Sequence, residues 1–519
     1  MKKRFIPLLM ALLLGNWACD PDTLDIKNQN QYSDATYFTT DVQFNEATIA
    51  TYATLLHQGL YARDWYFTFD LLGNDAERNT PLLGDLAEFP IYAHTGANPV
   101  IQQTWGSLYR MIFRANLVID RATAWNPTMA AEQTNKKQYI AEASFLRGWA
   151  QMQLTQLWGA VPLRPNSASA QNAEAPRASV AEGWAAVERD LTKAATDLPL
   201  TYPDAQLGRA TRGAAVALLG KALLYQKKYA QAQAQLQQLL QAPYSYALTP
   251  NYDDLFTAGK MTNETIFAVQ HRWVGWDQGN AFYMFGGQET WGNKNTASGR
   301  GMEYGWNDWQ NVQVAPSLAM AFKYKNEAGA DYVDPRAKLT FYGDAASGGD
   351  VDYCNACTGG AKPYPFADKK ILAWRKYNNY EVREKEDLPA SNISSQLIRL
   401  ADVKLMLAET FIEQNNLAGA LAQINDVRRR VGAFAYTSLG AQDNARLLLR
   451  RERQLELAGE QSRFFDLVRW GIAQQTINPE KQRQLNRTPF LPRHVLLPIP
   501  QGEKDTNPLV RASVTDDWN

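Results

Sequence analysis

The chain has 519 residues, of which 45% are hydrophobic and 20% charged, a composition typical of a folded globular protein. Its 53 basic residues balance its 53 acidic residues, so the formal net charge is zero. This balance, with no basic stripe along the chain, argues against a nucleic-acid-binding surface.

The N-terminus has the pattern of an export signal. A short basic start precedes an apolar run over residues 5–14, which is too short to span a bilayer and predicts a cleaved signal peptide over residues 1–18. Cys19 follows directly, behind a loose lipobox, and we expect its thiol to be acylated. A non-lipidated export signal is the alternative. Acyl chains on Cys19 would anchor the protein to a membrane, with residues 19–40 as an acidic tether.

Apolar residues spaced three and four apart predict several amphipathic helices in an N-terminal region over residues 41–242. The predicted helices cover residues 41–60, 102–123, 136–158, 180–198, 211–225 and 229–241. A polar loop lies between the first two of these helices. Its side chains Asn74, Asp75 and Glu77 are candidate ligand-binding groups, because carboxylates and amides can bond the hydroxyl groups of a ligand.

The segment over residues 243–392 interrupts the helical pattern. Its residues 271–309 combine large aromatic side chains with many glycines, so neither a helical nor a strand period survives. Aromatic rings on irregular loops suit stacking on sugar rings or peptide side chains, although such rings can also fill the protein's own core. The candidate ligand-binding rings, each with a glycine nearby, are Trp273, Trp276, Trp291, Tyr304 and Trp306.

The same segment contains a CxxC pair, Cys354 and Cys357, in a loop rich in Gly and Asp. One such pair, with no second pair and no neighbouring His, is weak evidence for zinc. No βαβ pattern surrounds it, which argues against a thioredoxin-like redox role. In an exported protein, we expect a local disulfide.

A second helix pair, over residues 400–430, repeats the spacing of the pair that precedes this long segment. In both pairs small residues stand twelve apart, at Gly220 and Ala232 and at Ala408 and Ala420. This spacing would let the two helices of a pair approach closely and matches the tetratricopeptide pattern, with coincidence between two amphipathic hairpins as the alternative. We therefore predict a mainly α fold, a tetratricopeptide-like helical superhelix with a large, irregular, loop-rich excursion.

The C-terminal region over residues 393–519 also contains predicted helices over residues 444–457 and 462–470. Acidic and basic residues are dense in these two helices, and opposite charges three or four apart can pair along a helix. We interpret them as a structural network rather than a catalytic cluster. Residues 496–500, which include two prolines, cannot be helical and should lie extended against the body.

Motifs that carry catalysis are missing from the sequence. Only four His are present, without an HExxH pair, and there is no GxSxG, GxxxxGK[ST] or GxGxxG motif. We therefore expect a non-enzymatic protein without a cofactor or a bound metal. A surface glycoside hydrolase is a remote alternative, because the separation between two carboxylates cannot be read from a sequence.

Several separate blocks of the chain resemble one family. They cover residues 143–150 (ASFLRGWA), 157–163 (LWGAVPL), 209–219 (RATRGAAVALL), 398–403 (IRLADV), 450–460 (RRERQLELAGE), 463–471 (RFFDLVRWG) and 497–500 (LPIP). Together they resemble the SusD/RagB family of outer-membrane nutrient-binding lipoproteins of Bacteroidetes. The acidic residues after Cys19 also resemble the signal that sends such lipoproteins to the cell surface.

The resemblance implies a lipid-anchored protein on the outer membrane that covers a SusC-like TonB-dependent transporter. It would capture oligosaccharides and deliver them to the transporter; capture of peptides, as in RagB-like members, is the alternative. Ligand sites in the family lie on variable loops, so the blocks above transfer no binding residue to this chain. The polar loop and the aromatic stretch remain the predicted site.

Overall fold

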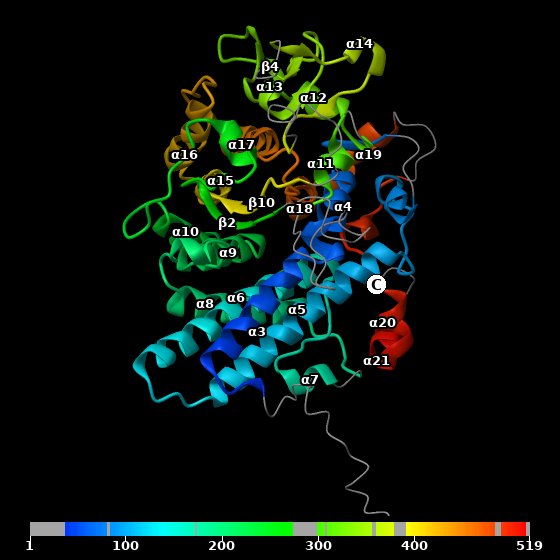
Figure 1. The fold of residues 1–519 in the computed structure, drawn as a ribbon. Helices are drawn as coiled ribbons and strands as arrows, with labels where there is room; N and C mark the ends of the chain where they lie inside the picture. Colours follow the sequence, from blue (N-terminus) through cyan, green and yellow to red (C-terminus); the bar gives the residue numbers. More distant parts are fainter. Residues whose placement is uncertain are drawn as a thin grey trace, which may run out of the picture.

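The computed structural model describes residues 37–79, 84–171, 174–272, 298–306, 309–354, 360–377, 391–482 and 489–514. The predicted signal peptide and Cys19 lie outside these residues. Figure 1 shows long helices in the lower half of the view and short helices and strands in the upper part. Within the described residues, no helix combines the length and the apolar character needed to cross a membrane.

Helices packed together form the N-terminal region (Figure 1). They are α3 (Asp41–Ala53), α4 (Asp64–Leu72), α5 (Pro99–Ala124), α6 (Ala130–Trp158), α7 (Ser167–Gln171) and α8 (Val180–Asp197). The longest of them are α5, α6 and α8. The side chains of Thr40, Asn98 and Ser179 accept hydrogen bonds from first-turn N–H groups of α3, α5 and α8, and thereby fix where these helices begin.

One predicted helix is shorter than the sequence pattern indicates. The helix expected over residues 41–60 ends at Ala53, and the chain continues through the short turns η3 (Thr54–Leu56) and η4 (Gln58–Ala62). Gly59 lies directly against α5 in this segment: a Cβ atom there would stand 2.6 Å from the backbone carbonyl carbon of Gln103. The turns therefore bring the backbone onto α5 more closely than a regular helix with side chains would allow.

The two predicted helix pairs are confirmed. They consist of α9 (Arg212–Tyr225) with α10 (Tyr229–Gln238) and of α15 (Leu400–Glu413) with α16 (Leu417–Arg430). A Cβ atom at Gly220 would lie 2.6 Å from Cδ2 of Leu236, so the absence of a side chain is what lets α9 and α10 approach. Helix α10 also packs on α15, so the two pairs stack on each other.

The long excursion contains more regular structure than its sequence indicates. Its elements are η7 (Tyr252–Phe256), β2 (Thr265–Val269), α11 (Arg300–Tyr304), β3 (Val312–Val314), α12 (Pro316–Ala321), β4 (Lys323–Lys325), β5 (Asp331–Val333), α13 (Arg336–Thr340), β6 (Phe341–Tyr342), β7 (Asp352–Cys354), β8 (Lys362–Pro363), α14 (Phe366–Lys369) and β9 (Ala373–Trp374). These elements are too short to produce a recognisable period. The predicted disulfide partner Cys357 lies outside the described residues.

Antiparallel pairs of strands attach the excursion to the rest of the fold. Among the described residues, each sheet has two strands: β1 (Ala76–Arg78) with β3, β2 with β10 (Ser395–Arg399), β4 with β5, β6 with β9, and β7 with β8. The pairs β1–β3 and β2–β10 join the excursion to the N-terminal and C-terminal regions, respectively. The excursion is therefore attached to both helical regions, near its start through β2 and near its middle through β3.

The C-terminal region ends in helices and one extended segment. Its remaining elements are α17 (Gln442–Glu456), α18 (Arg463–Arg469), α19 (Ala473–Gln482), η10 (Pro492–Val495), α20 (Gln501–Thr506) and α21 (Pro508–Ser513). The predicted extended segment is confirmed: the Leu497 N–H donates to the Leu157 carbonyl at 2.6 Å, and the Trp158 indole N–H donates to the Pro498 carbonyl at 2.9 Å.

The charges of α17 and α18 do form a structural network, but mostly with other elements rather than along one helix. The Glu456 carboxylate is fully buried and pairs with the guanidinium groups of Arg336, Arg399 and Arg430. These partners come from α13, the end of β10 and α16. Because a buried charge is costly unless it is fully paired, this network fixes how the excursion and the helix pairs meet.

Candidate functional site

The predicted ring of Tyr304 lies in the core. It is 1% exposed, and its hydroxyl donates to the Asp70 carboxylate at 2.6 Å. The buried Arg300 guanidinium lies 4.9 Å from the Tyr304 ring centre and 3.4 Å from that of Tyr377, and it pairs with Asp70 at 3.0 Å. Tyr304 therefore fills the protein's own core and does not face a ligand.

Trp306 is also buried, with 6% of its surface exposed. The rings of Tyr353 and Tyr364 meet it edge-on, at centroid distances of 4.8 and 5.4 Å. The remaining predicted rings, Trp273, Trp276 and Trp291, lie outside the described residues, so their role stays a prediction.

The predicted polar loop is used inside the protein. Asn74 accepts a hydrogen bond from Arg463 at 2.9 Å, and Asp75 accepts one from Gln454 at 2.7 Å. Burial raises the pKa of Asp75 to about 6. Glu77 lies on β1, opposite Gln313 of β3. All three predicted side chains are buried, so this loop joins β1 to the C-terminal helices rather than presenting a polar surface.

A pocket that the sequence did not indicate lies where α4, α6, α9, β10 and the turn between α17 and α18 meet. Aromatic side chains form one wall. The rings of Trp65 and Trp149 lie 5.8 Å apart, and Phe465 stacks on Trp65 at 6.3 Å with an interplanar angle of 20°. The volume of the pocket is about 70 Å³. Phe465 of this wall is partly exposed.

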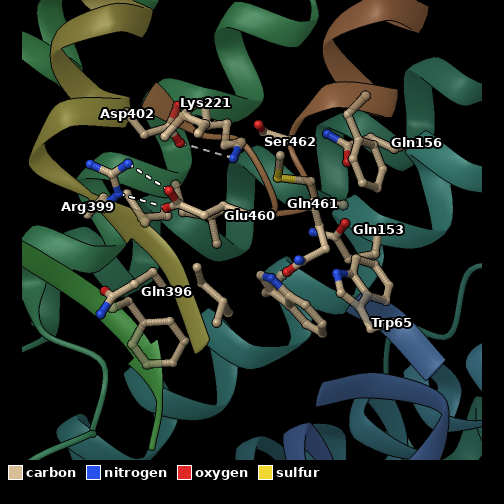
Figure 2. A pocket seen from close by; sticks show the side chains of 18 of the residues that line it. Trp65, Gln153, Gln156, Lys221, Gln396, Arg399, Asp402, Glu460, Gln461 and Ser462 are labelled. Carbon is tan, nitrogen blue, oxygen red and sulfur yellow. Dashed lines mark hydrogen bonds and ion pairs between the residues drawn. The ribbon is translucent and has the colours of Figure 1, made fainter. Parts of the chain in front are cut away.

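Charged pairs form the opposite side of the pocket (Figure 2). Lys221 of α9 pairs with Asp402 of α15 at 3.3 Å, and Arg399 pairs with Glu460 at 2.8 Å. Burial alone would lower the pKa of the Lys221 ammonium, but the Asp402 carboxylate outweighs it and raises the pKa. The charges that face the pocket are thus already balanced within the protein.

Glutamine side chains lie on both sides of the pocket. Figure 2 shows Gln153 near Trp65 with Gln156 farther up on the same side, Gln461 near the middle, and Gln396 on the other side, below Arg399. Gln153 is only 7% exposed. The buried Gln156 Nε2 and Gln396 Oε1 have no hydrogen-bond partner among the described residues. Amide groups in an aromatic pocket can bind hydroxyl groups, because an amide both donates and accepts hydrogen bonds.

Gln461 has an unusual backbone conformation. Its φ is +56°, in the left-handed region that side chains other than glycine seldom adopt. The Gln461 Nε2 donates to the Gly459 carbonyl at 2.9 Å and to Asp70 at 3.2 Å, which holds the turn in place. Because Asp70 also accepts from Tyr304, the predicted ring lies behind the wall of this pocket. Strained residues held by their surroundings often occur at functional sites.

Little in the sequence pointed to this pocket. Trp65 belongs to an aromatic run, but that run gives no sign of which ring meets a cavity. Trp149, Gln153 and Gln156 stand four and three apart and share one face of α6, which was visible as helical spacing. The partner side, with Gln396 and Gln461, comes from segments more than two hundred residues away. No local pattern links them.

Two family models match this chain. The model described as "Starch-binding associating with outer membrane" matches residues 22–224, and the model described as "SusD family" matches residues 263–512. The chain belongs to the SusD/RagB family. The resemblance predicted from the motif blocks is thus confirmed, as is the mainly helical, SusD-like fold; the tetratricopeptide character of the helix pairs stays a prediction.

Relatives of this SusD-family chain align over nearly its whole length. SusD-like protein P25 of Formosa agariphila is 25% identical over 99% of this chain and 98% of its own. A SusD superfamily protein from Bacteroides vulgatus has a TM-score of 0.75 at 25% identity, covering 92% of this chain and 99% of its own. A structure described as a laminarin binding SusD-like protein has a TM-score of 0.70 at 25% identity, covering 90% and 98%.

The pocket of this SusD-family chain lies at the junction of the two matched regions. Trp65, Trp149 and Lys221 come from the N-terminal match, whereas Gln396 and Gln461 come from the C-terminal match. A SusD fold thus brings together side chains that neither half could place alone.

Proposed function

We propose that this protein is a carbohydrate-capturing lipoprotein of the outer membrane that delivers its ligand to a SusC-like TonB-dependent transporter. The observation that carries the proposal is the pocket, in which the rings of Trp65 and Trp149 lie beside amide groups of Gln153 and Gln156. Aromatic faces bind the apolar faces of sugar rings, and amides bind their hydroxyl groups. The laminarin-binding neighbour and the starch-binding description of one matched family support the same ligand class.

Binding without catalysis agrees with the state of the pocket's carboxylates. Burial alone would raise the pKa of Asp402, but Lys221 and Arg453 lower it well below its usual range. Burial alone would also raise the pKa of Glu460, but Arg399 and Lys376 lower it below its usual range. A glycosidase needs one carboxyl that stays protonated near neutral pH to act as a general acid. Neither of these two groups fits that role, which supports a binding protein.

Delivery to a transporter rests on family membership and on the N-terminal signal. Acylated Cys19 would hold the protein at the membrane, and the acidic residues that follow it would direct it to the cell surface. The aromatic candidates Trp273, Trp276 and Trp291 are part of the proposal as further sugar-stacking rings outside the pocket.

The direct test measures binding of the purified protein to a panel of soluble glycans that includes laminarin, with a peptide library as the second arm. We expect at least one glycan to bind. Binding of peptides alone would contradict the proposed ligand class and favour a RagB-like role. Binding of neither would contradict the capture function.

Localisation and the transporter partner need a separate experiment. Cells that express the wild-type chain should incorporate labelled palmitate into it and expose it to external protease, whereas a Cys19→Ser variant should lose the label and leave the membrane fraction. A SusC-like protein should co-purify with the wild type from detergent-solubilised outer membranes. Wild-type protein without label, or without such a partner, would contradict the anchor or the delivery step.

A further inference from the structure

The pocket contains hydrogen-bonding groups that the protein itself does not use. Gln153 projects into the pocket from α6 and is nine-tenths buried, and no hydrogen bond joins its amide to any described residue (Figure 2). Gln156 Nε2 and Gln396 Oε1 also lack partners among the described residues. The Gln396 Nε2 donates to the Leu255 carbonyl at 3.4 Å, which fixes the orientation of that amide. A buried polar atom without a partner is costly, so the Gln156 Nε2 and Gln396 Oε1 atoms, together with the Gln153 amide, indicate a polar ligand.

The charged groups of the same pocket are not available to a ligand. Lys221 and Arg453 share the Asp402 carboxylate, at 3.3 and 2.9 Å. Arg399 pairs with Glu460 at 2.8 Å and also with Glu456 at 2.6 Å. An anionic ligand would have to displace one of these buried carboxylates, and leaving such a carboxylate unpaired is strongly unfavourable. The free groups are neutral amides, which match neutral hydroxyl groups.

The size of the pocket limits how much of a ligand can enter. A volume of 70 Å³ holds roughly five to seven water molecules, at about 10–15 Å³ of such volume for each. A hexose has twelve non-hydrogen atoms, so the pocket can enclose one edge of a single sugar unit and has no room for a second unit. The aromatic wall of Trp65 and Trp149 offers apolar faces on which one such ring can lie.

We propose that this pocket recognises one neutral, hydroxyl-rich sugar unit at the end of a saccharide chain, with the Gln153 amide as its principal hydrogen-bonding group. The inference rests on the proposed carbohydrate-binding function and sharpens it, because it assigns the terminal unit to the pocket. The rest of the saccharide lies outside the pocket.

The test uses the full-length protein and saturation-transfer NMR with single sugars. Glucose, galactose and mannose are the neutral probes, and glucuronate and galacturonate are the anionic probes. We expect at least one neutral hexose to bind at millimolar concentration and to compete with a longer saccharide that the protein binds. We expect the uronates to bind at least tenfold more weakly, because Lys221 and Arg399, the cations among the described lining residues, are already paired.

Variants place the binding in the pocket. Gln153→Leu keeps the size of the side chain and removes the amide, so we expect roughly three- to tenfold weaker hexose binding. Gln156 is partly exposed, and Gln156→Leu provides a second variant should Gln153→Leu not fold. Gln103→Leu is the matched control, because the Gln103 Oε1 is also buried without a partner but lies on α5, outside the lining of the pocket. It should bind as the wild type does.

The outcomes separate this inference from the proposed function. Unchanged hexose binding in folded Gln153→Leu and Gln156→Leu would overturn the inference, as would uronates binding as tightly as neutral sugars. A polysaccharide that binds the wild type and both variants equally, without competition from any single sugar, would leave the proposed function intact and reject the pocket as its site. If no saccharide of any length binds, the proposed function fails as well.

Discussion

Replacing Glu456 with Gln tests whether the buried charge network holds the fold together. The change removes one negative charge and keeps the size of the side chain. Glu456 is fully buried and pairs with Arg399 at 2.6 Å, with Arg336 at 3.2 Å and with Arg430. In the variant, these three guanidinium groups keep their positive charges in the interior and lose their common partner. Glu452 and Glu264 compensate part of this charge.

The expected loss follows from the burial of the whole cluster. Breaking a buried ion pair on one side typically costs about 3–5 kcal/mol, because the remaining charge stays desolvated. We therefore expect the free energy of unfolding of Glu456→Gln to fall by about that amount at pH 7. The matched control is Asp443→Asn on the same helix, whose side chain is 91% exposed and pairs with Arg446 at 2.6 Å. An exposed pair contributes less than about 1 kcal/mol.

Urea unfolding followed by circular dichroism measures both variants. The three arginines lower the pKa of Glu456 well below the usual value, although burial alone would raise it. A carboxyl with a depressed pKa in the fold contributes stability above its unfolded pKa, near 4.5, and loses it as pH falls further. The penalty of Glu456→Gln should therefore be full at pH 7 and shrink below about pH 4.5. A penalty below about 1 kcal/mol at pH 7, or one equal to that of Asp443→Asn, would refute the reasoning.

Three further predictions concern packing, pH and the ligand. Gly220→Val should lower the free energy of unfolding by about 1–3 kcal/mol, because a Cβ atom at Gly220 would lie 2.6 Å from Leu236 of the facing helix. Gly106→Ala should be neutral or stabilising in the same denaturation assay, because a Cβ atom at Gly106 would have no described neighbour within 4 Å. Burial raises the pKa of Asp64 to about 7. The folded protein therefore loses stability as the pH rises from about 4 to 7, because the buried carboxyl must ionise. Asp64→Asn should raise the melting temperature at pH 8 and leave it unchanged at pH 4. Trp291→Ala should weaken glycan binding without lowering the melting temperature, whereas Trp306→Ala should lower the melting temperature because that ring is buried; the reverse pattern would contradict the ligand-facing prediction.

The helices could be predicted because each carries its own signal. The repeated apolar spacing of α5, α6 and α8 is a local feature, and the structure has all three helices. Helix α8 matches its expected bounds closely, whereas α5 and α6 begin three and six residues earlier than expected. The close approach of α9 and α10 at Gly220 could also be predicted, because small residues stand twelve apart in both helix pairs. The short strands of the excursion were not readable, because two or three residues cannot establish a period.

The candidate site was harder to predict because burial depends on partners far away in the sequence. A Tyr beside Gly residues looked accessible at position 304, yet Asp70 and Arg300 enclose it. Asp75 likewise looked like a surface carboxylate until Gln454 and Arg463 of the C-terminal region surrounded it. The density of aromatic residues in a segment predicts where aromatic contacts occur. Only the fold decides whether a given ring contacts a ligand or another side chain.

The aromatic stretch and the pocket meet at one strand, which gives the two parts of the proposed site a common frame. His271, at the start of the stretch, hydrogen-bonds Ser395 at 3.0 Å, next to Gln396 of the pocket. Farther along the stretch, the N–H groups of Ser298 and Ser391 each donate to the other's carbonyl, at 3.1 and 2.7 Å. His271 is thus fixed at the first residue of β10, which also forms part of the pocket wall, and Ser298 is fixed at Ser391, four residues before that strand. The aromatic stretch and the pocket act on the same ligand only if Trp291→Ala and Gln153→Leu each weaken binding of the same saccharide.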